Sequence, residues 1–330
     1  MNARPSLVRV AAAIVVIASA AACSSSGDSD EVTAPTDNAT ASTSAPASPP
    51  SAPASSSQSA GQSVTLKATV TNTDGSILVL VPLTVGGKKF AWVVDSGASS
   101  SILDAKAAKL AGLDSQPVKG TVTTLGCTVK PTVAEVTDWA VGNTKLPTTK
   151  LITQDLGFKN AKAGGLPIGG LLGADFQLGT KVVRIDYAGE KVVFGAPPAA
   201  GGKTVDLTVN KAKAGVTVTA PVTVGGTKII MQLDTGAPRS TMGKATANRL
   251  GLPTAGKPSK FNAAGCPATV QPVKLTKAKL GDIALPDAAI NRTDKGAPTT
   301  GAAALLGSDI LSTFKTITID YTQSKLTLGG

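Results

Sequence analysis

The amino-acid sequence contains a long internal repeat, and this repeat constrains the fold more than any other feature. Residues 81–98 read VPLTVGGKKFAWVVDSGA, and residues 220–237 read APVTVGGTKIIMQLDTGA. The two segments align without a gap, so that Asp95 corresponds to Asp234, 139 positions later. Self-similarity of this extent predicts two copies of one structural unit.

A second block of the repeat indicates how far each copy extends. Residues 171–173 and 305–307 both read Leu-Leu-Gly, 134 positions apart, and an Ile-Asp-Tyr sequence follows each of them at the same offset. We therefore expect an N-terminal lobe over residues 63–200 and a C-terminal lobe over residues 201–330. The Pro/Ala/Gly stretch at 196–202 would join them.

Each copy has the composition of a mostly β unit. Residues 64–71, 78–85 and 191–194 are short runs rich in β-branched side chains, which is typical of strands. The Gly-Gly pairs at 86–87 and 225–226 lie between such runs, where they predict tight hairpin turns.

A short helix is expected after each Asp-Ser/Thr-Gly sequence. In the first copy, apolar side chains recur at helical intervals and Gly112 stands near the expected end. These side chains are Leu103, Ala107, Leu110 and Leu113. The second copy has its counterpart at residues 241–252.

The first 22 residues, 1–22, have the features of an export signal. Two arginines precede an apolar run at 10–22 that is too short to span a bilayer as a helix. The run leads directly into Cys23 and resembles the lipobox of bacterial lipoproteins, although Ala20 stands where such boxes more often carry Leu. The alternative is an ordinary cleaved signal peptide with an incidental cysteine. Both interpretations place the mature chain outside the cytoplasm.

Residues 23–62 read as a lipidated, disordered tether. After Cys23 the segment consists mainly of Ser, Ala, Thr and Pro and has almost no large apolar side chain. Such a segment buries too little surface to offset the entropy of ordering it. We expect a chain that is attached through Cys23 to the outer face of the cell membrane and carries its folded part on this tether.

Composition narrows the chemistry that the folded part can perform. The sequence has no histidine, which excludes Ser-His-Asp and Cys-His catalysis and the usual ligand sets of zinc hydrolases. Carboxylates, Lys or Tyr would have to transfer protons instead. The formal net charge of +11 favours an anionic membrane or cell-wall surface. Nucleic acid is not expected as a partner, because the lysines are dispersed and aromatic side chains are few.

Asp95 and Asp234 are the candidate catalytic residues. Each ends an apolar, strand-like run and enters a turn of Ser/Thr-Gly-Ala, which places a carboxylate on a rigid element. A single Asp-Ser-Gly sequence is ordinary turn chemistry. Two of them, in register with a repeated Leu-Leu-Gly, are much harder to attribute to turns alone.

On these motifs, each copy resembles a retropepsin-type aspartic protease protomer, and the pair resembles the single-chain arrangement of the pepsin superfamily. The resemblance covers residues 75–195 and 214–328. It implies a mostly β, bilobal pepsin-like fold made of two duplicated retropepsin-like β-barrel lobes, with one short helix or two per lobe. It also implies a monomer whose lobes are related by a pseudo-twofold axis.

The resemblance implies a role for each residue of the two motifs. The carboxyls of Asp95 and Asp234 would share one proton and activate a water molecule between them, with no metal and no cofactor. Ser96 and Thr235 would exchange hydroxyl hydrogen bonds across the axis. The other residues implied to support the active site are Gly97, Ala98, Gly236, Ala237, Leu172, Gly173, Leu306 and Gly307.

Two cysteines remain after Cys23, and they also repeat. Cys127 and Cys266 are 139 positions apart, and Gly126 and Gly265 precede them. In an exported protein a disulfide between them is the preferred interpretation. By resemblance they lie on the two flap hairpins, which such a bridge would tie together over the cleft. The alternative is two small side chains too far apart to bond.

The second copy departs from the first just after its motif. Pro238-Arg239 replaces Ser99-Ser100, which would place a positive charge near one side of the cleft. A solvated surface arginine is an equally good interpretation. No tyrosine lies between Asp95 and Leu171, so any flap is of the retropepsin kind.

The sequence therefore predicts an extracytoplasmic aspartic endopeptidase that acts on polypeptides in an extended conformation. Two alternatives with the same fold stay open: a catalytically silent peptide-binding module, and an envelope scaffold lipoprotein. Both copies keep the Asp and the Gly of their turns, which favours the enzyme. The sequence does not indicate the substrate.

Overall fold

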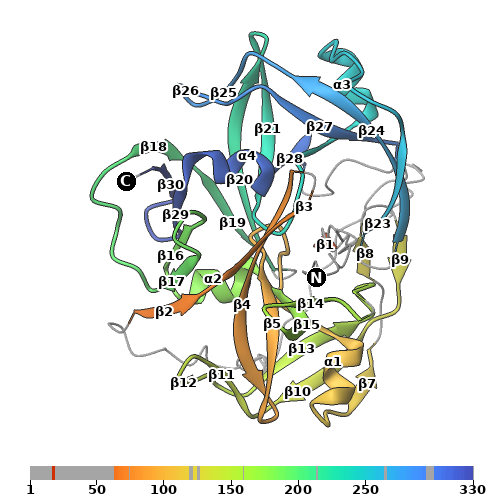
Figure 1. Ribbon diagram of the computed structural model, residues 1–330, viewed down its shortest axis with the longest axis vertical. Coiled ribbons are helices and arrows are strands. Elements are labelled where there is room, and N and C mark those ends of the chain that lie inside the picture. The colour runs from red at the N-terminus through yellow and green to blue at the C-terminus, as the bar shows by residue number, and fades with distance from the viewer. Residues whose placement is uncertain are drawn as a thin grey trace, which may run out of the picture.

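The computed structural model describes most of the chain after the expected tether (Figure 1). The described residues are 63–73, 75–118, 122–124, 127–158, 160–212, 215–263, 266–294 and 301–329, together with Ile17–Ala18. The expected export signal and tether otherwise lie outside them. Within this described part, no helix has the length and apolar character that crossing a bilayer requires.

The first copy of the repeat is built mainly of strands. The strands are β2 (Val64–Lys67), β3 (Thr69–Thr73), β4 (Ser76–Val85), β5 (Lys88–Val94), β6 (Ile102–Asp104), β7 (Ser115–Pro117), β8 (Val122–Thr124), β9 (Cys127–Val129), β10 (Thr132–Val136), β11 (Trp139–Val141), β12 (Thr144–Lys145), β13 (Thr149–Gln154), β14 (Lys162–Ala163), β15 (Leu166–Leu172), β16 (Val182–Asp186) and β17 (Lys191–Phe194). The helices are α1 (Ala105–Leu110) and α2 (Ala174–Gly179).

The second copy follows the same order. Its strands are β18 (Lys203–Asp206), β19 (Thr208–Ala212), β20 (Gly215–Val224), β21 (Thr227–Asp234), β22 (Thr241–Gly243), β23 (Ser259–Ala263), β24 (Cys266–Leu275), β25 (Ala278–Leu280), β26 (Ile283–Ala284), β27 (Ala288–Thr293), β28 (Ala304–Gly307), β29 (Thr316–Asp320) and β30 (Lys325–Leu328). Its helices are α3 (Lys244–Arg249), α4 (Ser308–Leu311) and the 3-10 helix η1 (Ser312–Phe314).

Each copy forms a large sheet with the same unusual connection. In the first copy β15 runs parallel to β5 and antiparallel to β6, while β13 runs parallel to β6. In the second copy β28, β21, β22 and β27 pair in the same way. The repeated topology confirms that the fold is bilobal and duplicated.

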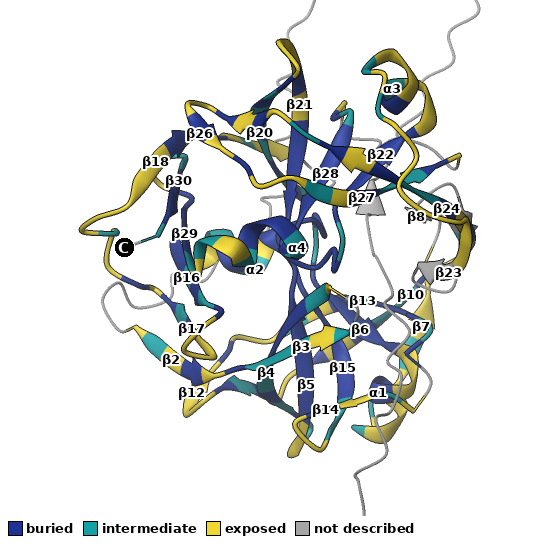
Figure 2. Cartoon of the chain, turned by 45° about the horizontal axis from the view of Figure 1, so that its top comes forward, coloured by how far each residue is buried: buried dark blue, intermediate teal, exposed yellow. Residues whose placement is uncertain are grey.

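A third sheet joins the two lobes. Its order is β18-β30-β29-β16-β17-β2, and β16 of the first copy pairs antiparallel with β29 of the second. Figure 1 shows this sheet to the left, between the first copy below and the second copy above. Buried apolar side chains from both copies form one continuous core around it. Figure 2 shows buried segments along β5, β21, β28 and α4, where the lobes meet.

The expected hairpin turns are confirmed. Strands β4 and β5 are joined by Gly86 and Gly87, which have φ values of +56° and +70°. Gly225 and Gly226 join β20 and β21 at φ values of +55° and +89°. Glycine reaches this left-handed region without the steric cost that other residues incur, so the Gly-Gly pairs predicted these turns correctly.

Two expected elements differ in extent from the structure. The run at 64–71 is broken at Ala68, whose N–H donates to the carbonyl of Glu190, because β2 belongs to the joining sheet and β3 pairs with β4. The helix expected at 241–252 is limited to α3, because residues 241–243 form β22 between β27 and β28. Sheet pairing overrode local propensity at both places.

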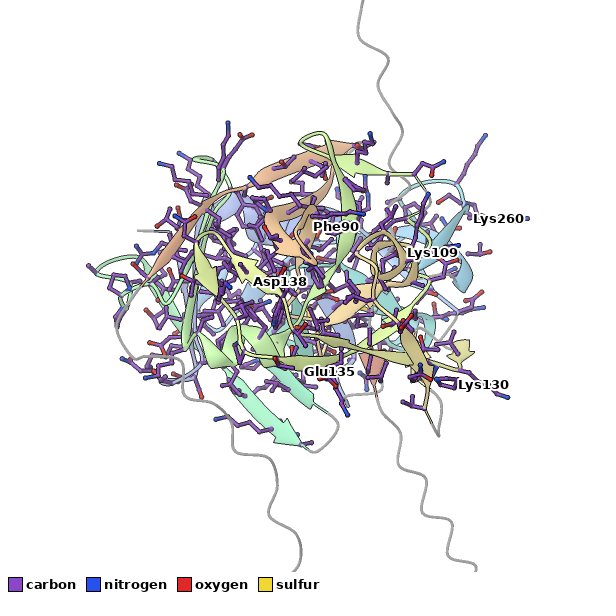
Figure 3. The ribbon with its side chains drawn as sticks, turned by 90° about the horizontal axis from the view of Figure 1, so that it is seen from below. Phe90, Lys109, Lys130, Glu135, Asp138 and Lys260 are labelled. Atoms are coloured by element: carbon purple, nitrogen blue, oxygen red, sulfur yellow. The ribbon has the colours of Figure 1, made fainter. Side chains whose placement is uncertain are left out.

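Two further hairpins project from the large sheets. β8 pairs antiparallel with β9, and β23 pairs antiparallel with β24. The segment Ile17–Ala18 (β1) lies antiparallel to β8 and completes a small three-stranded sheet. Lys130, just after β9, and Lys260, on β23, extend outward from this part of the molecule (Figure 3).

Candidate active site

The two candidate aspartates stand at equivalent points of the two large sheets. Asp95 directly follows β5, and Asp234 is the last residue of β21. Behind each of them runs the Leu-Leu-Gly strand, which pairs Leu172 with Val94 and Gly307 with Asp234. The N–H of Asp95 donates to the carbonyl of Leu172 at 3.0 Å. Both aspartates are fully buried, at 0% exposure.

The two turns face each other so closely that each carboxyl rests on the glycine of the other lobe. A Cβ atom on Gly97 would lie 2.1 Å from Cγ of Asp234, and one on Gly236 would lie 2.2 Å from Cγ of Asp95. No side chain fits at such distances, so these positions require glycine. The structure therefore brings the two carboxyls together across the interface between the lobes.

One oxygen of each carboxyl, Oδ1, is held by its own turn. The N–H groups of Gly97 and Ala98 both donate to Oδ1 of Asp95 at 2.9 Å. The N–H of Ala237 donates to Oδ1 of Asp234 at 2.7 Å, and the backbone of Gly236 also interacts with that carboxyl. Backbone donors orient the carboxyls and leave the Oδ2 atoms for chemistry.

The second oxygen of each carboxyl, Oδ2, is buried and has no backbone donor. Within the described part of the chain, neither Oδ2 of Asp95 nor Oδ2 of Asp234 has a hydrogen-bond partner among the protein donors. A proton on either one allows the two carboxyls to hydrogen-bond to each other. A buried pair of this kind favours one shared proton over two negative charges.

Burial perturbs both acids in the same direction. Burial raises the pKa of the Asp95 carboxyl to about 6, partly offset by the N–H donors of Ala98 and Gly97. The pKa of Asp234 is raised well above its ordinary value by burial first and by the negative charge of Asp95 second. Because burial and the neighbouring carboxyl both disfavour a second negative charge, the pair retains one proton after the first has left.

Ser96 and Thr235 bind the two turns to each other. The N–H of Ser96 donates to Oγ1 of Thr235 at 3.0 Å, and the N–H of Thr235 donates to Oγ of Ser96 at 3.1 Å. The hydroxyl of Ser96 donates to the carbonyl of Leu233 at 2.9 Å, and that of Thr235 to the carbonyl of Val94 at 2.7 Å. These four buried hydrogen bonds fix the turns relative to one another.

Comparison with known families is decisive here. A sequence model described as aspartyl protease matches residues 81–176 and 220–310, one match in each lobe and together more than half of the chain. The chain belongs to the aspartyl protease family. Its fold is accordingly the mostly β, two-lobed fold of pepsin-like proteases, with few and short helices.

Solved structures of similar proteins align with most of this chain. The aspartic proteinase from Irpex lacteus aligns over 81% of this chain and 97% of its own, with 11% identity and a TM-score of 0.44. Basic 7S globulin from soybean aligns over 81% of this chain and 94% of its own, with 12% identity and a TM-score of 0.44. No curated protein sequence matches the chain.

The Leu-Leu-Gly strands of the protease lie directly behind the turns. A Cβ atom on Gly173 would lie 2.5 Å from the backbone of Ser100, and one on Gly307 would lie 2.7 Å from the backbone of Ser240. Leu172 and Leu306 are buried in the core on this side. Ala98 and Ala237, also buried, accept backbone hydrogen bonds from Ala174 and Ser308 at 2.8 and 2.9 Å, which ties each turn to the helix that follows the strand.

A second pair of aspartates supports the protease turns and was missed from the sequence. Asp175 accepts hydrogen bonds from the N–H and the hydroxyl of Ser101 at 2.8 and 2.7 Å, and Asp309 does the same for Ser240 at 2.8 Å each. Burial raises the pKa of both carboxyls. Both belong to a repeated Leu-Leu-Gly-x-Asp sequence, so the signal was present in the repeat.

Arg239 bridges the two lobes of the protease. Its Nε donates to Oγ of Ser76 in the first lobe at 2.9 Å, and its side chain is half-buried. Beside it, the N–H of Ile77 donates to the carbonyl of Pro238 at 3.0 Å. The arginine therefore contacts the opposite lobe. Neither of the two interpretations from the sequence, a charge beside the cleft or a solvated surface residue, predicts this contact.

The two cysteines occupy equivalent backbone positions on the projecting hairpins. Cys127 pairs with Thr124 and Cys266 with Ala263, and each cysteine is the first residue of the returning strand, β9 or β24. The cysteine side chains, and Gly126 and Gly265, lie outside the described residues. The disulfide therefore stays a prediction.

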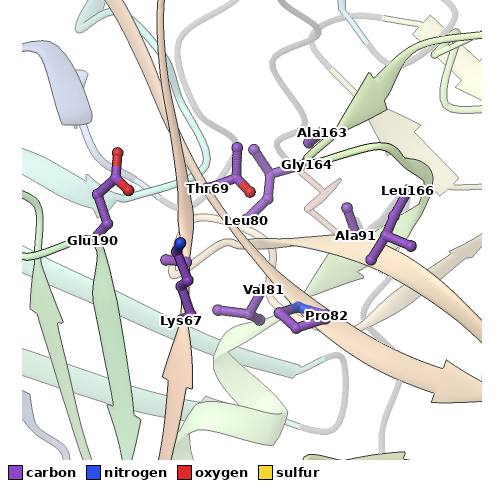
Figure 4. Close-up of a pocket in the computed structure, with 11 residues that line it drawn as sticks. Lys67, Thr69, Leu80, Val81, Pro82, Ala91, Ala163, Gly164, Leu166 and Glu190 are labelled. Carbon is purple, nitrogen blue, oxygen red and sulfur yellow. The ribbon is translucent and has the colours of Figure 1, made fainter.

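A cavity of about 380 Å³ opens on the first lobe, away from the aspartates (Figure 4). Its lining includes Leu80, Ala91 and Leu166, with the charged side chains of Lys67 and Glu190. None of the residues of the Asp-Ser-Gly-Ala and Asp-Thr-Gly-Ala turns lines it. Among the described residues, no group of three or more His, Cys, Asp or Glu side chains is arranged to hold a metal ion.

Proposed function

We propose that this aspartyl protease family member is an active extracytoplasmic endopeptidase, which hydrolyses peptide bonds with a water molecule activated between Asp95 and Asp234. One observation carries the proposal. Two fully buried carboxyls meet across the lobe interface, with their Oδ1 atoms held by backbone N–H groups and their Oδ2 atoms without a hydrogen-bond partner among the described residues. This arrangement supports general acid and base catalysis by a single protonated pair.

The perturbed pKa values support a division of roles between the two acids. The pair retains one proton, and we assign its ionised carboxyl to Asp95 as the base that removes a proton from the attacking water. Asp234 keeps its proton and donates it to the carbonyl oxygen of the scissile bond. Water oxygen bonds to the carbonyl carbon and gives a tetrahedral diol. The proton taken by Asp95 then goes to the amide nitrogen as the carbon–nitrogen bond breaks, and a diol proton returns to Asp234.

The bonds between the turns support this chemistry by fixing the distance between the acids. Ser96 and Thr235 bond each turn to the backbone of the other lobe, so the carboxyls do not need to be organised when a substrate arrives. Preorganised polar groups contribute most to catalysis when they need no rearrangement in the transition state.

A polypeptide in extended conformation is the proposed substrate. Each lobe carries a projecting hairpin, and β8 takes Ile17–Ala18 as an antiparallel neighbour in the structure. A strand edge that takes one extended segment supports the binding of another through main-chain hydrogen bonds. Specificity would then depend on side-chain pockets along that segment.

We further propose that the protease acts outside the cytoplasm, anchored through a lipid on Cys23. The apolar run before Cys23, the Ser- and Pro-rich segment after it and the net positive charge support this location. Cys23→Ser should abolish incorporation of a labelled fatty acid and release the protein from the membrane fraction. Unchanged labelling of the Cys23→Ser variant would contradict the anchor.

One observation favours a second candidate, a catalytically silent peptide-binding or scaffold lipoprotein. The Oδ2 atoms of Asp95 and Asp234 are closed to solvent in this structure, so a substrate reaches them only after the protein opens. If the opening never occurs, peptides would bind to the hairpins without being cut.

Cleavage of a peptide library distinguishes the two candidates. The wild-type protein should cut a subset of peptides, whereas Asp95→Asn and Asp234→Asn should not, because an amide cannot act as the base or carry the shared proton. Asp114→Asn is the matched control, since Asp114 is exposed and lies after α1. Peptide binding without cleavage by the wild-type protein would establish the silent alternative.

A further inference from the structure

Two tyrosines lie beneath the catalytic turns, at the ends of strands in the joining sheet. Tyr187 follows β16 and Tyr321 follows β29, and the sequence contains no other tyrosine. Both side chains are buried, and the two positions are equivalent in the repeat. Burial raises the pKa of both phenols, so each hydroxyl remains a neutral hydrogen-bond donor.

Tyr321, in the second copy, reaches into the first lobe. Its hydroxyl donates to Oε1 of Gln177 on α2 at 2.9 Å, and Nε2 of Gln177 donates to the carbonyl of Leu172 at 3.0 Å. The same carbonyl accepts the N–H of Asp95 at 3.0 Å. A continuous buried chain of hydrogen bonds therefore connects Tyr321 to the backbone of Asp95.

Tyr187, in the first copy, reaches into the second lobe. Its hydroxyl lies 3.1 Å from Oγ of Ser308 at the start of α4, and that Oγ donates to the carbonyl of Thr235 at 2.9 Å. Because a serine hydroxyl has one hydrogen, Tyr187 must be the donor in the first of these bonds. The chain ends at the residue next to Asp234.

Main-chain hydrogen bonds also connect each tyrosine to the opposite lobe. The N–H of Tyr187 donates to the carbonyl of Lys315 in the second lobe, and the N–H of Tyr321 donates to that of Lys181 in the first, both at 2.8 Å. Lys181 follows α2 closely and Lys315 follows η1. Each tyrosine is thus bound at two points to the segment that follows the Leu-Leu-Gly strand of the opposite lobe.

We propose that Tyr187 and Tyr321 are positioning residues, which form a crossed lock that sets the separation of the two carboxyls. The catalytic part of this inference rests on the proposed endopeptidase function, whereas the lock itself concerns the geometry of the dyad. The separation of Asp95 and Asp234 depends on how the lobes meet. Buried, directional hydrogen bonds resist sliding at that interface more than apolar contacts alone do.

The two hydroxyls can be removed one at a time without changing the rings. Tyr321→Phe leaves Oε1 of Gln177 without its donor, and Tyr187→Phe leaves Ser308 without its donor. Carbon-13 NMR titration of the side-chain carboxyls in the substrate-free protein reports the dyad directly. Tyr321→Phe should lower the pKa of Asp95 from about 6 toward its ordinary value, because a loosened turn admits water. Tyr187→Phe should act mainly on Asp234.

Steady-state kinetics supply the second measurement. Each variant should lower kcat about tenfold, the effect of losing one buried hydrogen bond of ordinary strength, while KM changes little. Thr204→Val is the matched control. Thr204 lies on β18, the edge strand of the same sheet, and its hydroxyl is 3.5 Å from the hydroxyl of Thr327. This variant should titrate and cleave as the wild type does.

A double variant tests the route through Gln177. In a Gln177→Met background, Tyr321→Phe should cause no further change in kcat or in the titration of Asp95, because the connection is already broken. Full additivity of the two substitutions would contradict this route. A role in packing alone would change the melting temperature and leave the carboxyl titrations as they are.

The outcomes distinguish a failure of the proposed lock from a failure of the proposed endopeptidase function. If Asp95→Asn abolishes cleavage but both Tyr→Phe variants keep wild-type titrations and kcat, the lock is wrong. If the wild type cleaves no peptide while the Tyr→Phe variants shift the carboxyl titrations, the lock is correct and the proposed function is wrong.

Discussion

Gly97 of the first lobe lies against the carboxyl of Asp234 in the second, so closely that a Cβ atom at position 97 would be 2.1 Å from Cγ of the aspartate. Gly236 and Asp95 form the equivalent contact. The glycines thus do more than permit a turn, because they make room for the acid of the other lobe. The dyad exists only where two copies of the turn meet.

Replacing Gly97 by Ala should therefore disrupt the dyad. The added methyl group must displace the carboxyl of Asp234, and we expect a loss of about 1–3 kcal/mol in the free energy of unfolding and of about 100-fold in kcat/KM. Gly179→Ala is the control, since Gly179 lies in α2 and, in the described structure, has open space where its Cβ would be. Denaturant titration and kinetics of both variants check the prediction. A Gly97→Ala protein as stable and active as the wild type would contradict the close approach.

The bonds between Ser96 and Thr235 predict a coupled loss of stability. Ser96→Ala and Thr235→Ala each remove a buried hydroxyl that both donates and accepts, and each should cost about 1–3 kcal/mol. The double variant should lose less than the two single losses combined, because each single substitution already breaks the exchange. Thr235→Ser keeps the hydroxyl and should lose little. If the double variant loses as much stability as the two single variants combined, the two turns are not coupled.

Stability should depend on pH through the dyad in a defined direction. The folded-state pKa of Asp95 is about 6, above its ordinary value of 3.8, so the neutral acid contributes stability that is complete below pH 4 and is lost as the pH rises through 6. Asp95→Asn removes this dependence. Between pH 4 and pH 8, the free energy of unfolding of the variant should rise by about 2 kcal/mol relative to that of the wild type, as measured by denaturant titration. A constant difference across this range would contradict the raised pKa.

The backbone positions of Cys127 and Cys266 support a prediction about a disulfide. Cys127 and Cys266 each begin the returning strand of a projecting hairpin, one from each lobe. We expect a disulfide between them in the exported protein. Peptide mapping without reductant should recover the two hairpins as one linked peptide. Recovery of both residues as thiols that are alkylated in the native protein would show that the bridge does not form.

The dyad and its coupling were accessible from the sequence because they lie within the repeat. Asp95, Ser96 and Gly97 align with their partners at a single offset, and the residue types at those positions match one known chemistry. Hairpin turns at the Gly-Gly pairs were equally accessible, since they depend on local backbone conformation.

The tyrosine lock could not be predicted in the same way. The repeat shows that Tyr187 and Tyr321 are equivalent, but not that each enters the opposite lobe. Their partners do not repeat either: Gln177 aligns with Leu311, and Ser308 aligns with Ala174. Contacts between the copies depend on how the lobes pack. No local sequence pattern predicts that packing.

The strand at Ala68 illustrates the same limit at the level of the fold. A continuous run of β-branched residues predicted one strand, and the structure divides it between the joining sheet and the first lobe. Pairing partners far along the chain determine where such a run breaks.

The central claim is that Asp95 and Asp234 work as a pair that carries one proton, and the pH dependence of kcat/KM on a single peptide substrate tests it most directly. Because burial raises the pKa of both carboxyls, to about 6 for Asp95, we predict a bell-shaped profile whose acid limb lies near pH 6 and whose activity falls again when the second proton leaves the pair. Activity that still rises above pH 9 would contradict the account and would indicate a lysine base instead.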